Sequence, residues 1–231
     1  MKSLPTSYTA ARKWGIILLL ALASLGAALL SMSFGSTQVP FSEILTALMG
    51  GETQAYNIVV YARLPRTLAA LLCGSALAVG GVIIQGVLGN PLAGPNIIGV
   101  NAGAGLGAVL CAALIPTSMT AVPVAAFLGA LGACMLVYTL ARRTGASRIT
   151  LVLAGVAISS MLSAAIDAVS ILFPEAALGA GSFMVGRLSG VTVAALKVPA
   201  LLSLLAGAGA FAMSYELDLL TLGDGVAQSL G

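Results

Sequence analysis

The sequence predicts an all-α protein, a polytopic bundle of transmembrane helices with about six spans and a cytoplasmic N-terminus. Hydrophobic residues make up 59% of the 231 residues and charged residues only 7%, whereas a soluble domain carries about 25% charged residues. So little charge cannot cover a water-facing surface. The apolar residues also gather into stretches of about 20, the length that a helix needs to cross the roughly 30 Å hydrocarbon core.

Six apolar stretches are long enough to span a membrane. They cover residues 14–33, 65–89, 95–115, 120–141, 149–172 and 191–214. The first follows two basic residues, as a signal peptide does, but five more stretches and no convincing cleavage site follow it, so we expect a retained helix. Because no stretch suits a soluble domain of useful size, we interpret residues 1–231 as a single transmembrane domain.

Lysines and arginines near the ends of the stretches predict the orientation. Six of them fall on one side, the predicted cytoplasm: Lys2, Arg12, Lys13, Arg142, Arg143 and Arg148. The other side receives Arg63, Arg66, Arg187 and Lys197. Residues 34–61 then form an external loop, in which Pro40 is placed to open a short surface helix.

Glycines are spaced for close helix packing. Gly99, Gly103 and Gly107 stand four residues apart. In lipid the hydrophobic effect does not pull helices together, so close backbone approach through small residues contributes more to their association. This spacing predicts a compact bundle.

Composition excludes several kinds of site. The chain has no histidine, the commonest metal ligand and general base. Its three cysteines stand in separate apolar stretches and match no zinc, haem or redox motif. We therefore expect no cofactor, no metal site and no catalytic residue. The net charge of +3 is too small and too scattered for a nucleic-acid partner.

Arg63 and Arg66 precede the second stretch, on the side where positive charge is scarce. One interpretation is that both side chains reach the lipid headgroups and anchor the helix. The other is that they dock an acidic partner, since Pro65 stiffens the segment and a guanidinium pairs with carboxylates through a planar fork.

The second stretch closes in a segment rich in proline and glycine. Asn90, Pro91 and Pro95 predict a tight hairpin between two helices at the cytoplasmic surface. Gln85, within the stretch, is either a hydrogen-bond partner of another helix or a residue that lines a path.

Residues 215–231 turn polar after the sixth stretch and predict a cytoplasmic segment. Asp224 is placed to cap a short helix on which Val226, Ala227 and Leu230 fall near one face. An amphipathic helix on the lipid surface is the alternative, but the segment has no lysine or arginine for anionic lipid.

Four segments resemble one known family. They are Arg63-Leu64-Pro65-Arg66, the run from Gln85 through Asn90-Pro91-Leu92-Ala93 to Ala104, Leu153-Ala154-Gly155-Val156-Ala157, and Leu217 to Gly231. They resemble the permease subunits of ABC importers for iron–siderophore complexes, haem and cobalamin, over the chain from about residue 14 onward. The resemblance implies a subunit of about ten helices that pairs with a second permease subunit, as a homodimer or heterodimer. Since six stretches are visible, we expect a truncated member.

The resemblance also implies roles for particular residues. Arg63 and Arg66 would dock an external solute-binding protein. A cytoplasmic ATPase subunit would seat the last segment, whose coupling residues would be Leu222, Gly223, Asp224, Val226, Ala227, Leu230 and Gly231. Gln85, Asn90, Pro91 and Pro95 would line the translocation path or form its turn.

We therefore predict a multi-pass permease subunit, surrounded by lipid in the inner membrane, for the uptake of iron–siderophore complexes. It is not an enzyme, because a separate ATPase supplies the energy. Haem or cobalamin is the alternative metal-chelate cargo. An ion-coupled secondary transporter is a further alternative, which needs carboxylates or unwound helices at mid-membrane; Asp167 is the only such carboxylate in a predicted span.

Overall fold

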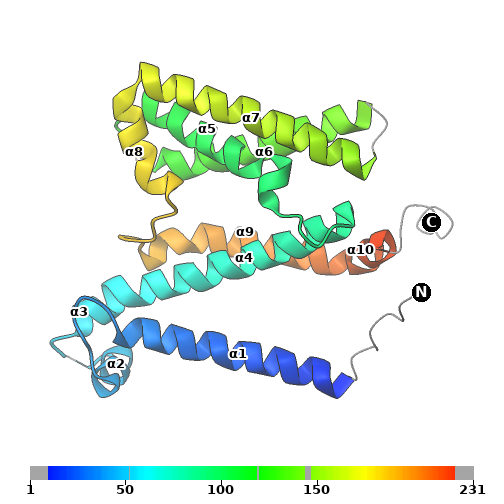
Figure 1. Cartoon of the computed structure of the whole chain (residues 1–231). Helices are drawn as coiled ribbons and strands as arrows, with labels where there is room; N and C mark the ends of the chain where they lie inside the picture. The colour runs from blue at the N-terminus through cyan, green and yellow to red at the C-terminus, as the bar shows by residue number, and fades with distance from the viewer. Residues whose placement is uncertain (1–9, 52, 119, 144–146, 222–231) are drawn as a thin grey trace. The chain divides into compact units, whose positions relative to one another are not determined.

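The computed structural model describes residues 10–51, 53–118, 120–143 and 147–221, and every regular element in these ranges is a helix (Figure 1). In chain order they are α1 (Ala10–Ser33), α2 (Phe41–Leu48), α3 (Tyr56–Ile58), the π-helical η1 (Val59–Arg63), α4 (Leu64–Leu88), the 3-10 helix η2 (Pro95–Ile98), α5 (Val100–Leu114), α6 (Ala121–Arg143), α7 (Arg148–Leu172), α8 (Pro174–Met184), α9 (Val193–Ala212) and α10 (Ser214–Thr221). The prediction of an all-α protein is confirmed.

Five helical stretches in the described ranges are long and apolar enough to cross a membrane. They are Ala11–Ser33, Tyr56–Leu88, Ala121–Arg143, Arg148–Leu172 and Val193–Ala212. Each matches one of the six predicted spans, which confirms a polytopic helical bundle. The orientation of these helices across a membrane stays a prediction.

The predicted span 95–115 is a broken helix instead. It consists of η2 and the 15-residue α5, separated by Gly99. Gly99 has φ 77°, a left-handed conformation that glycine adopts without strain and that ends the 3-10 helix. At about 1.5 Å per residue, α5 is roughly 22 Å long and falls short of the hydrocarbon core.

The second span begins at Tyr56 rather than at residue 65. From Tyr56 to Leu88 the chain is helical throughout, with π-helical geometry in η1. Proline inside an α-helix clashes with the carbonyl four residues before it, here that of Tyr61. The wider turn of η1 contains that carbonyl and accommodates Pro65. Arg63 and Arg66 therefore lie within the helix, about two and three turns from its start.

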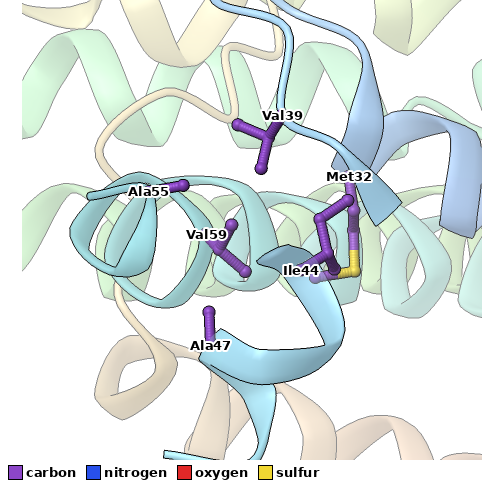
Figure 2. Packing of buried hydrophobic residues seen from close by; sticks show 6 residues of the cluster. All are labelled: Met32, Val39, Ile44, Ala47, Ala55 and Val59. Carbon is purple, nitrogen blue, oxygen red and sulfur yellow. The ribbon is translucent and has the colours of Figure 1, made fainter. Parts of the chain in front are cut away.

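The chain divides into two compact units, and the first comprises residues 1–74 and 188–201. Its core is a cluster of six buried side chains (Figure 2): Met32, Val39, Ile44, Ala47, Ala55 and Val59. The short helix predicted after Pro40 is present as α2, and its Ile44 and Ala47 are buried in this cluster. This cluster thereby packs three elements together, namely the C-terminal end of α1, the short helix α2 and the turn η1.

The second unit comprises residues 75–187 and 202–231, and α5 packs against α6, α7 and α8 in it (Figure 1). A β-carbon added at Gly103 or Gly107 of α5, or at Gly129 of α6, would lie less than 3.0 Å from a backbone oxygen of the facing helix. Glycine is thus what allows α5 and α6 to pack so closely. The predicted role of Gly103 and Gly107 is confirmed, while the single-domain organisation of residues 1–231 stays a prediction.

Candidate functional site

Arg63, the last residue of η1, reaches back to the C-terminal end of α1. Its Nη1 donates hydrogen bonds to the carbonyl oxygens of Met32 at 2.6 Å and Ser33 at 2.9 Å, and its Nη2 donates to that of Thr37. The last carbonyls of a helix have no partner within the helix, and they favour a nearby cation. Arg63 therefore closes α1 and fixes the turn that follows it.

Arg66 lies one helical turn further on and is exposed. Within the described part of the chain it makes no hydrogen bond or ion pair. It lines, together with Arg63, an open cavity of about 530 Å³. The remaining walls come from the end of α1 and its following turn, from residues 58–62 and from residues 188–190. Two permanent positive charges thus line one concave surface in the first unit.

The opposite side of this helical turn is packed rather than exposed. Pro65 is fully buried, and Thr67 is only 6% exposed. The Thr67 hydroxyl lies 3.2 Å from the hydroxyl of Ser31 on α1, within hydrogen-bond distance. These contacts fix the position of the backbone at Arg66 relative to α1.

The turn after α4 has the geometry that its sequence predicts. Gly89 has φ 60°, and the side-chain oxygen of Asn90 accepts a hydrogen bond from the backbone N–H of Leu92 at 2.9 Å. An asparagine that bonds two residues ahead in this way stabilises a tight turn. Pro95 is then the first residue of η2. Asn90 and Pro91 are exposed and Pro95 is half-buried.

Gln85 is exposed at the start of the last turn of α4. In the described ranges its side chain forms no hydrogen bond to another helix. Both interpretations of this residue, a hydrogen-bond partner of another helix and a residue that lines a path, stay predictions.

Arg148, which the sequence marked only as a determinant of orientation, joins elements that are distant in the chain. It is the first residue of α7, and its Nη2 donates a 2.7 Å hydrogen bond to the carbonyl of Leu220, near the end of α10. A β-carbon at Gly89 would overlap its guanidinium. The predicted coupling residues, Leu222, Gly223, Asp224, Val226, Ala227, Leu230 and Gly231, lie outside the described residues and directly follow α10.

The described residues offer no metal centre, since no three His, Cys, Asp or Glu side chains among them are grouped to hold an ion. Asp167 is exposed on α7, and it forms no ion pair with another described residue.

Comparisons with known proteins relate the chain to transport proteins. The FecCD transport family matches residues 18–231. The Fe(3+) dicitrate transport system permease protein FecD of Escherichia coli is 36% identical over 220 residues, which are 95% of this chain and 68% of the relative. The ferric enterobactin transport system permease protein FepD of Escherichia coli is 38% identical over 221 residues, with 94% and 65% covered.

Two further comparisons extend this picture. A probable heme-iron transport system permease protein, IsdF of Staphylococcus aureus, is 31% identical over 217 residues and covers 94% of this chain and 65% of the relative. The solved structure of an inward-facing ABC transporter, assigned to the metal-chelate type, has a TM-score of 0.76 at 26% identity and covers 94% of this chain and 66% of that one. The chain thus spans about two thirds of the length of the proteins that it matches.

Proposed function

Because the chain belongs to the FecCD transport family, we propose that it is a permease subunit of an ABC importer that carries iron–siderophore complexes across the inner membrane. The observation that carries this proposal is the match, along 94–95% of the chain, to permeases named for ferric dicitrate and ferric enterobactin. Members of this family are transport components rather than enzymes, and ATP is hydrolysed by a partner subunit. The relative named for heme-iron supports haem as the second candidate cargo.

The proposed cargo needs no metal ligand from the permease. A chelator that surrounds its iron presents only its own outer surface to the protein. The permease then has to supply a passage that opens to each side in turn, between this chain and a second permease subunit.

Uptake into proteoliposomes tests the function. The importer is reconstituted with its ATPase and its binding protein, and ferric enterobactin, ferric dicitrate and haem are offered in turn. We expect ATP-dependent accumulation of a ferric chelate. Uptake of haem alone would favour the second candidate, and uptake driven by an ion gradient without ATP would overturn the proposal in favour of a secondary transporter.

Arg63 and Arg66 are the proposed docking site for the external solute-binding protein. Arg66 is exposed in the cavity, so it is the arginine that a carboxylate on the partner reaches directly. Arg63 adds positive charge to the same cavity while its N–H groups hold the end of α1. Exposed ion pairs are weak one by one and are screened by salt, so docking through them is strongest at low ionic strength.

Charge reversal tests the docking site. Arg66→Glu should weaken binding of the solute-binding protein several-fold at low salt and less at high salt. Arg187→Glu is the matched control, because Arg187 is also an exposed arginine of the predicted external side and does not line this cavity. Equal affinity of the wild type and Arg66→Glu would rule out docking at this cavity.

The segment that follows α10 is the proposed contact with the ATPase. Movement of the ATPase on binding ATP would displace this segment and, through it, the membrane helices. Gly223→Pro or Asp224→Lys should then uncouple ATP hydrolysis from uptake. Normal ATP-driven uptake in both variants would argue against a coupling role.

The translocation path is the third proposed site. Gln85 would line it, and Asn90, Pro91 and Pro95 would shape the turn at its cytoplasmic end. The exposure of Gln85 and the tight geometry of the turn support this assignment.

A further inference from the structure

Arg148 stands where its charge does not stabilise its own helix. It is the first residue of α7, and the positive end of a helix dipole disfavours a cation in the first turn. The start of α7 already has a cap, because the Ser147 hydroxyl accepts a 3.1 Å hydrogen bond from the backbone N–H of Thr150. Arg148 therefore does not contribute to stability through its own helix, and any stabilisation comes from the groups that its side chain contacts.

The side chain contacts the end of another helix. The 2.7 Å hydrogen bond from Nη2 of Arg148 reaches the carbonyl of Leu220, the last residue but one of α10, 72 residues away in the chain. Carbonyls in the last turn of a helix lack a partner within it, and the negative end of the helix dipole favours a cation. The guanidinium therefore stabilises the end of α10 and ties it to the start of α7.

The same guanidinium lies directly on the turn after α4. A β-carbon at Gly89 would overlap Nη1 of Arg148 in its present position, and the φ of 60° at Gly89 is one that favours glycine. Nearby, a β-carbon at Gly86 would lie 3.8 Å from Cγ2 of Thr221, the last residue of α10. The turn after α4 and the end of α10 thus both adjoin the guanidinium of Arg148.

We propose that Arg148 is a positioning residue that locks the end of α10 to the turn after α4 and to the start of α7, so that movement of the segment beyond Thr221 is transmitted to that turn. The inference rests on the proposed coupling role of residues 222–231. Without this link, the end of α10 moves independently of the turn that contains Asn90 and Pro91.

The experiment measures the ratio of chelate transported to ATP hydrolysed by the complete importer in proteoliposomes. Arg148→Gln removes the link, and Arg143→Gln is the matched control, because Arg143 is an exposed arginine of the same predicted side. Coupling between sites commonly corresponds to about 5–150-fold, and we expect the ratio to fall about fivefold in Arg148→Gln, while ATP hydrolysis and the amount of assembled complex stay near those of Arg143→Gln. A ratio equal to that of the control would overturn the proposal.

Two further variants keep the test sharp. Gly89→Ala forces the guanidinium away without changing any charge and also strains a backbone with φ 60°, so it should lower the ratio as well. Once the guanidinium has been displaced, adding Arg148→Gln to Gly89→Ala should lower the ratio no further. Additive effects would overturn the link. Arg148→Lys keeps the positive charge but not the guanidinium. If Arg148→Lys has the wild-type ratio of chelate transported to ATP hydrolysed, and Gly89→Ala does not change that ratio, then Arg148 only sets the orientation of the helices across the membrane. If the wild-type importer itself shows no ATP-driven uptake, the proposed function fails instead.

Discussion

The close packing of α5 on α6 makes a sharp prediction about two glycines of one helix. Gly129 and Gly132 both lie in α6, three residues apart. A β-carbon at Gly129 would lie less than 3.0 Å from the carbonyl oxygen of Gly103 on α5, whereas one at Gly132 would meet nothing within 4 Å. The same substitution, glycine to alanine, therefore creates a clash at one position and fills open space at the other.

The magnitude follows from what the two variants share. Alanine stabilises a helix interior by about 0.5–1 kcal/mol relative to glycine, and this gain is common to both. The difference is the overpacking at Gly129, typically about 1–3 kcal/mol. The clash is with a backbone oxygen, which cannot rotate away, so the helices must separate and lose part of their dispersion contacts. We expect a difference near the upper end, about 3 kcal/mol.

Two measurements check this difference in the purified protein. Thermal unfolding in detergent should show Gly129→Ala melting below Gly132→Ala. Cys111, a buried residue of α5 on the same helical face as Gly103 and Gly107, should react faster with a thiol reagent in Gly129→Ala, in a background in which Cys73 and Cys134 are serine. Equal melting temperatures and equal Cys111 reactivity in the two variants would refute the close approach of α5 and α6.

Three other predictions concern single contacts. Arg63→Gln should lower the free energy of unfolding by about 2 kcal/mol, because the carbonyls at the end of α1 lose a charged hydrogen-bond donor. It should also speed protease cleavage in the turn after α1. If Arg66→Gln has the same effects, the stabilisation of this turn is not specific to Arg63. Thr67→Val should cost about 1 kcal/mol through the lost hydrogen bond to α1, measured by thermal unfolding, and no change would mean that the bond contributes nothing. Gly155→Ala should destabilise the protein, because its β-carbon would overlap the backbone of η2, while Gly181→Ala meets nothing within 4 Å; equal melting of these two variants would contradict that contact.

The spans could be predicted because they depend on length and hydropathy, which local sequence contains. The exception is the predicted span 95–115. Its sequence contains a signal for the break, because Pro95 begins and Gly99 ends a 3-10 helix before α5 begins. Hydropathy alone does not register such a break. The start of the second span was missed for a related reason, since Pro65 is a common helix boundary and becomes an interior residue only beside the π-helical η1.

The side-chain contacts of the two arginines could not be predicted from the sequence. Arg63 binds backbone carbonyls about 30 residues earlier, and Arg148 binds one 72 residues later. Every residue has a carbonyl, so nothing in the sequence distinguishes the acceptor. Only the fold brings these groups together. The exposure of Arg66, in contrast, fits the sequence pattern, because a charged residue after a buried proline on a helix has to point elsewhere.

The π-helical turn η1 has a consequence for how the chain tolerates insertions and deletions. A single π-helical turn has one residue more than the α-helix that it interrupts. Because five residues of this turn take the place of four, removing one residue between Val59 and Arg63 would restore a regular α-helix and leave the segments on either side in nearly the same orientation. Val59 would stay in the buried cluster, and Arg66 would stay at the cavity. The wide turn is therefore the place where this helix can lose a residue while the cluster and the cavity keep their register.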